Sequence, residues 1–234
     1  MNIDEAFDRA VRALDEGRSL RGTGFWAAVD ELRRNSVLAI RYADRAAAID
    51  RRAFETGVRL RVPIAVGLWA LTLLSGIGVA AVVVARLAGA PVVGGWYEVD
   101  PDGLPGFVPI MFLIGFGALL LGTHSLAHWL VGRLAGIRFT HVFLGGPPPP
   151  RPGVKTDYAS YLRAAPVARA AMHASGAVLT KIVPFALLAA SIPLYDGWPW
   201  LTWILLVAGV GQILTDVFLS TKVSDWKKVR RELR

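Results

Sequence analysis

The stretch Gly122–Gly136, GTHSLAHWLVGRLAG, contains two histidines four residues apart inside a long apolar run. Residues with this spacing lie on one face of an α-helix, so His124 and His128 can present both imidazole rings to a single ligand. Two histidines at this spacing on a helix are typical of a divalent metal site. The stretch therefore predicts an apolar helix that can bind a metal ion.

The composition around this stretch is typical of a membrane protein. Of the 234 residues, 54% are hydrophobic, and the mean hydropathy is +0.45, which is too apolar for an ordinary soluble domain. The absence of cysteine excludes disulfides, thiolate metal sites and a cysteine nucleophile. The opening residues, MNIDEAFDRAVRALDEG, mix acids and bases without an apolar core, so we expect no cleavable signal peptide there.

Four apolar stretches reach the roughly 20 residues that a helix needs to cross a bilayer. We therefore expect an all-α polytopic membrane protein in which residues 1–62 form a cytoplasmic helical region and residues 63–234 form the membrane domain. Residues 132–171 would be a cytoplasmic loop and residues 220–234 a basic tail. The predicted spans are approximately 64–87, 107–131, 172–194 and 200–219.

The distribution of basic residues predicts the orientation. Residues 1–63 carry 12 Arg, and the segments 132–171 and 220–234 are also rich in Arg and Lys. The loop 88–106 contains only acidic charges. Basic loops stay on the cytoplasmic side, so we expect both termini in the cytoplasm, the plasma membrane as location and the lipid bilayer as partner. Nucleic-acid binding is disfavoured, because acids alternate with the N-terminal arginines and no stacking aromatics lie among them.

The segments outside the spans also carry patterns of secondary structure. Helical periodicity covers residues 3–16 and about 24–60, and it returns at 158–171 and 225–234. The alternation at 137–144 predicts a strand that ends at two glycines.

Ionisable residues inside spans are costly and usually functional. Apart from Arg86 at the end of the first, the predicted spans contain five of them: His124, His128, His173, Lys181 and Asp216. Counting about 1.5 Å per residue from the cytoplasmic boundary puts the first two histidines and Asp216 in one layer, with His173 close below. Two imidazoles and a carboxylate suit zinc. As an alternative, the histidines hydrogen-bond to neighbouring groups and Asp216 is a counter-ion for Lys181.

Several of these features together resemble the site-2-protease-like family of intramembrane zinc metallopeptidases. The resemblance covers 119–234 and rests on HSLAH at 124–128, FLGG at 143–146, MHASGA at 172–177 and the aspartate in GQILTDVFLS at 211–220. It implies that the last three spans form the family's core and that His124, His128 and Asp216 bind zinc.

The chain departs from that family at two positions. Around Asp216, only the aspartate matches the family's Asn-Pro-x-x-Pro-x-x-Asp-Gly context. Ser125 stands where the family has the glutamate that acts as general base, and a serine hydroxyl has no suitable pKa for that step. His173 is the spare titratable group at a similar depth and is the candidate substitute.

These observations favour a non-proteolytic membrane protein with a metal-capable site and a binding or regulatory role, whose partner would be a transmembrane segment or another membrane protein. A second hypothesis is an active intramembrane zinc metalloendopeptidase with a non-standard base. A third is a metal or proton carrier whose path is lined by the five ionisable residues of the spans.

Overall fold

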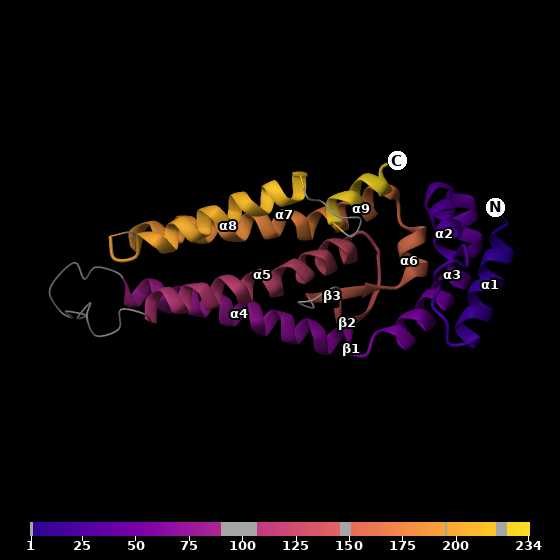
Figure 1. The fold of residues 1–234 in the computed structure, drawn as a ribbon, viewed down its shortest axis with the longest axis horizontal. Coiled ribbons are helices and arrows are strands. Elements are labelled where there is room, and N and C mark those ends of the chain that lie inside the picture. The colour runs from indigo at the N-terminus through magenta and orange to yellow at the C-terminus, as the bar shows by residue number, and fades with distance from the viewer. Residues whose placement is uncertain (1, 90–106, 146–150, 195, 219–223) are drawn as a thin grey trace. The chain divides into compact units, whose positions relative to one another are not determined.

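The computed structural model describes residues 2–89, 107–145, 151–194, 196–218 and 224–234 (Figure 1). The described chain is mostly helical and forms two compact units. The first unit comprises Met1–Gly67, His128–His173 and Lys228–Arg234. The second unit comprises Leu68–Ala127 and Ala174–Lys227.

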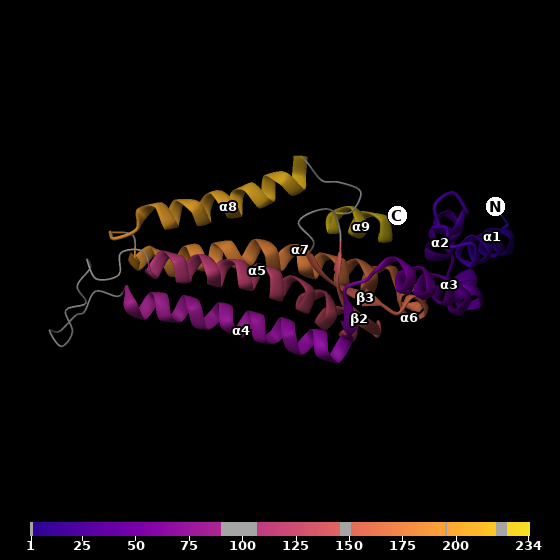
Figure 2. The same cartoon turned by 60° about the horizontal axis from the view of Figure 1, so that its bottom comes forward.

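Four helices are long and apolar enough to cross a membrane, as predicted. They are α4 (Ile64–Ala88), α5 (Phe107–Leu134), α7 (Pro166–Ser191) and α8 (Pro199–Phe218). In the second unit these helices run side by side in both views (Figures 1 and 2). Each contributes to one apolar core, which includes Val82, Ala85, Phe112, Val183, Leu187 and Leu205.

Glycines bring α4 and α5 into close contact. A Cβ added at Gly115 of α5 would lie 2.8 Å from the carbonyl oxygen of Gly78 on α4. One built at Gly122 would lie 2.9 Å from the carbonyl oxygen of Leu71. Small residues let backbones approach in this way, and such packing holds membrane helices together.

The N-terminal region is helical, but the single helix predicted at 24–60 is two helices. They are α2 (Phe25–Arg34) and α3 (Ser36–Gly57), which follow α1 (Ile3–Asp15). Asn35 separates them, since its backbone is extended and its side-chain oxygen accepts hydrogen bonds from the N–H groups of Val37 and Leu38, both at 3.1 Å. Asparagine is a strongly preferred helix cap, which explains why a new helix begins there.

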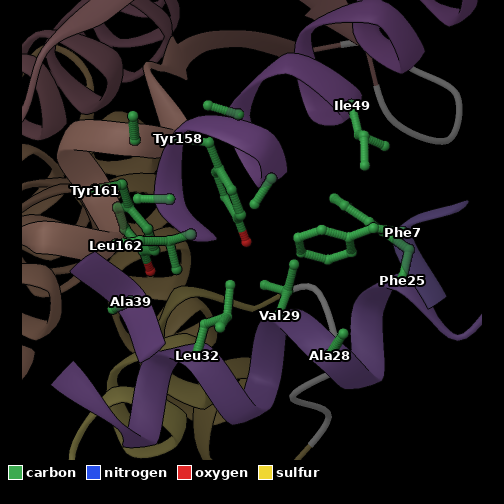
Figure 3. Close-up of a cluster of buried hydrophobic side chains, with 14 of the residues drawn as sticks. Phe7, Phe25, Ala28, Val29, Leu32, Ala39, Ile49, Tyr158, Tyr161 and Leu162 are labelled. Carbon is green, nitrogen blue, oxygen red and sulfur yellow. The ribbon is translucent and has the colours of Figure 1, made fainter. Parts of the chain in front are cut away.

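These helices form the core of the first unit together with α6 (Tyr158–Arg163). Figure 3 shows side chains from α1, α2, α3 and α6 meeting in one cluster. Phe7, Phe25 and Leu32 are completely buried there, and Tyr158 and Tyr161 pack against them with their rings stacked 5.5 Å apart.

The first unit also contains a small sheet, so the expectation of an all-α fold was wrong in this part. The middle strand β2 (Phe139–Gly145) lies where a strand was predicted. It pairs antiparallel with β1 (Arg61–Pro63) on one side and with β3 (Arg151–Thr156) on the other. Val142 of β2 faces Val62 across one pairing and Val154 across the other.

The helix predicted at 158–171 divides into α6 and the start of α7, which begins six residues before the predicted third span. Ala164 is extended after α6, and α7 begins at Pro166. Proline fits the first turn of a helix but disfavours helical backbone in the residue before it, which explains the break. The chain ends with the short helix α9 (Asp225–Glu232). By residue range, α4, α5, α7 and α9 each continue from one unit into the other.

Candidate metal centre

The two histidines of the HSLAH stretch both lie on α5, as the sequence predicts. His124 is partly exposed and His128 is buried. Because they are four residues apart on one continuous helix, they occupy the same helical face. The prediction that both histidines lie on one face of a helix is therefore confirmed.

A hydrogen bond fixes which nitrogen of His128 carries a proton. The Nδ1 atom lies 2.6 Å from the backbone carbonyl oxygen of Met172. A carbonyl oxygen can only accept, so Nδ1 is the donor and the neutral ring keeps its lone pair on Nε2. Metal-binding histidines are usually oriented by such a bond from their other nitrogen. The environment of His128 is therefore suited to a ligand at Nε2.

The carboxylate next to the histidines belongs to Asp225, the first residue of α9. Its Oδ2 atom lies 3.5 Å from Nε2 of His124. Ligand atoms of His124, His128 and Asp225 all lie within 4.8 Å of one another. Within the described parts of the chain, this is the group of three or more ligating side chains that could hold a metal ion. Asp225 was assigned to the basic tail from the sequence, so its role was missed.

Asp216, the predicted third ligand, is not a member of this group. Its carboxylate on α8 pairs with the ammonium group of Lys181 on α7, which is the alternative that the sequence left open. Equal depth in the membrane does not set the direction in which a helical side chain points, and a nearby cation inside a span is a strong competitor for a carboxylate. The sequence-based choice of Asp216 therefore needs correction to Asp225.

The residues considered for proton transfer have other environments. Ser125 is completely buried. His173 on α7 has its Nε2 atom 3.0 Å from the hydroxyl oxygen of Tyr161, and its ring centroid lies 6.2 Å from that of His128. His173 thus lies near His128 and shares a hydrogen bond with Tyr161.

A buried charge cluster in the first unit has no counterpart in the sequence-based prediction. The carboxylate of Glu232, at the end of α9, lies 2.6 Å from Nε of Arg169 and 3.5 Å from Nε of Arg33. The Tyr161 hydroxyl donates to the same carboxylate at 2.8 Å. The side chain of Glu232 is 0% exposed and that of Arg169 is 3% exposed. Glu232 was overlooked because it is one acid among many basic residues in the tail.

Burial raises the pKa of two tyrosines beside this cluster. Burial is the main cause at Tyr161, and the negative charge of Glu232 adds to it, so its pKa lies well above the ordinary value. Burial also raises the pKa of Tyr158 to about 12, against the opposing charge of Arg33. Both phenols therefore stay protonated at neutral pH. The Tyr161 hydroxyl donates to Glu232, whereas the Tyr158 hydroxyl accepts a hydrogen bond from Nη2 of Arg33.

No protein-family model, curated protein or solved structure matches this chain. The interpretation of the site accordingly depends on its own donor set. Two imidazole nitrogens and one carboxylate oxygen are a ligand combination that zinc accepts, with a fourth position left for water or another ligand.

Proposed function

We propose that this protein is an integral membrane protein that binds a divalent metal ion, zinc by its donor set, through His124, His128 and Asp225. The observation that carries the proposal is the approach of these three ligand atoms to within 4.8 Å of one another. The donor bond from His128 to the Met172 carbonyl adds support, because metal-binding histidines are usually oriented by such a bond from their other ring nitrogen. A bound zinc ion would act as a Lewis acid at its open position.

We further propose that the protein does not cleave peptides. The side chain after the first histidine is a buried serine, and the four spans contain no glutamate. Proton transfer to a leaving amine requires a positioned group with a suitable pKa, and its absence costs roughly 10²- to 10⁴-fold in rate. The hydrogen bond between His173 and Tyr161 engages the remaining candidate.

In this proposal the protein resembles the site-2-protease-like metallopeptidases in its metal site but lacks their peptidase chemistry. Residues 1–62, the loop 132–171 and the tail 220–234 are cytoplasmic in the same proposal, and the protein binds or regulates a transmembrane segment of a partner. The carrier hypothesis has less support, because Lys181 and Asp216 neutralise each other as a pair.

Metal analysis of detergent-purified protein tests the proposal. We expect about one zinc per wild-type chain, and we expect His124→Ala, His128→Ala and Asp225→Asn each to lower the affinity by at least about tenfold, since each removes one ligand. Asp216→Asn is the matched control, because it removes the same carboxylate charge from a residue that pairs with Lys181 instead.

Two outcomes would overturn this assignment. Wild-type protein that binds no divalent metal would mean that His124 and Asp225 form an ion pair only. Loss of zinc in Asp216→Asn with retention in Asp225→Asn would restore the ligand set predicted from the sequence.

A further inference from the structure

The short helix α9 carries two acids that point to the same side. Asp225 and Glu232 are seven residues apart, which is close to two helical turns and separates them by about 10 Å along the axis. Asp225 faces His124, and Glu232 is buried among Arg169, Arg33 and Tyr161. One helical face therefore holds a candidate metal ligand at one end and a buried carboxylate at the other.

Three basic residues of α9, Lys227, Arg230 and Arg231, are exposed. An eight-residue helix is not stable by itself in water, and like charges three and four residues apart, as in Lys227 with Arg230 and Arg231, destabilise it further. The helix must be stabilised by contacts with the remainder of the protein.

Glu232 supplies a buried ionic contact for this helix. Its carboxylate pairs with Arg169, whose side chain is only 3% exposed, and lies 3.5 Å from Nε of Arg33, which also pairs with Asp30. Removing one partner of a buried pair leaves an uncompensated charge, which is strongly unfavourable. A chain in which α9 detaches would bury the guanidinium group of Arg169 without that carboxylate, so the docked helix is favoured.

We propose that Glu232 is a positioning residue for the metal ligand Asp225, and that docking of α9 and metal binding stabilise each other. This inference depends on the proposed metal site. Because Glu232 holds the end of a continuous helix, it restricts where Asp225 can lie. Thermodynamic reciprocity then requires that a metal ion held by Asp225 also favours the docked helix.

The first test measures zinc affinity of the full-length protein in detergent. Groups that orient a metal ligand contribute roughly 10- to 100-fold to affinity, so Glu232→Gln should weaken zinc binding by about tenfold or more. Glu16→Gln is the charge-matched control, since the Glu16 side chain is 55% exposed in a surface pair with Arg18. This control should bind zinc as wild type does.

A double variant separates positioning from general damage. If Glu232 acts through Asp225, Asp225→Asn combined with Glu232→Gln should bind zinc no more weakly than Asp225→Asn alone. If the double variant binds zinc more weakly than Asp225→Asn by the same factor that Glu232→Gln alone causes, then Glu232 acts independently of Asp225. That result would overturn the inference. Unchanged zinc affinity in Glu232→Gln would overturn it as well.

The second test avoids substituting Glu232, which guards against a variant that fails to fold. Trypsin cuts after the lysines and arginines of α9 when the helix is undocked, and intact-mass measurement follows loss of the tail. Zinc should slow this cleavage several-fold in wild type and have no effect in Asp225→Asn. Wild-type protein that binds zinc but loses its tail at an unchanged rate would refute the coupling alone, whereas wild-type protein without zinc binding would refute the metal site itself.

Discussion

Ser125 occupies the position at which a carboxylate would face water on the metal, one residue after His124. We expect the wild-type protein to leave labelled single-span substrates intact and Ser125→Glu to produce metal-dependent cleavage. Because Ser125 is completely buried, the larger side chain must displace its neighbours, at a cost of about 1–3 kcal/mol in unfolding free energy. Cleavage assays and denaturation in detergent measure the two effects.

The control for this experiment is the double variant His124→Ala, Ser125→Glu, which removes a metal ligand and should be inactive. Metal-dependent cleavage by the wild type at ordinary enzymatic rates would contradict the assignment of a non-proteolytic protein.

Tyr158 makes stability sensitive to alkaline pH. Its pKa is raised from 10.0 to about 12 by burial, so between these values the folded protein keeps a proton that the unfolded chain loses. The folded state then binds more protons, and the unfolding free energy must fall as pH rises, by up to about 1.4 kcal/mol per pH unit for this group.

We therefore expect Tyr158→Phe to lose stability less steeply than wild type between pH 10 and pH 12. Denaturant titrations at several pH values, followed by circular dichroism, measure the slopes. Parallel curves for the two proteins would contradict this prediction.

The candidate metal centre was partly predictable from individual residues. The spacing of His124 and His128 was sufficient to predict that both rings lie on the same side, because helical geometry alone places residues four apart on one face. The third ligand was not predictable, because a count of residues gives the depth of Asp216 but not its direction. Asp225 follows a stretch outside the described residues, and nothing in the local sequence indicates that the tail returns to α5.

Among the helices, the close approach of α4 and α5 gives a matched pair of substitutions. Gly115→Ala would bring a methyl group to 2.8 Å from the Gly78 carbonyl oxygen, whereas Gly117→Ala meets nothing within 4 Å. Both replacements gain the same helix propensity, about 1 kcal/mol. We expect Gly115→Ala to lower the unfolding free energy by about 1–3 kcal/mol relative to Gly117→Ala.

Thermal or denaturant unfolding in detergent measures this difference. Equal stability of the two variants would show that α4 and α5 are packed less closely than the contact at Gly115 requires.

Helices were predicted correctly where the hydrophobic stretch in the sequence was long. All four spans were predicted, because about 20 consecutive apolar residues have few other stable arrangements. The short strands β1 and β3 were missed: β1 has three residues, and β3 contains proline and glycine, which are typical of loops. The break at Asn35 was missed because periodicity continues on both sides of it.

At the scale of the whole molecule, the absence of cysteine from the 234 residues allows a direct test of orientation. If both termini are cytoplasmic, a cysteine at Asp196, exposed between α7 and α8, should react with a membrane-impermeant maleimide in intact cells. Asp102, which lies outside the described residues, should behave in the same way. A cysteine at the exposed Arg51 of α3 should react only after permeabilisation.

The cysteine-free wild type is the background control for this labelling. The reverse pattern, with Arg51→Cys labelled in intact cells, would show that the N-terminal region lies outside the cell and would contradict the predicted topology.

The burial of Glu232 also has a consequence for biosynthesis. Arg33 and Arg169 are made well before their shared carboxylate, and at roughly 5–20 residues per second Arg33 precedes Glu232 by about 10–40 s. During that interval α2 and the start of α7 emerge from the ribosome without the carboxylate that later pairs with both guanidinium groups. The packing of Arg33 and Arg169 against α9 can therefore be completed only after all four candidate spans have been synthesised.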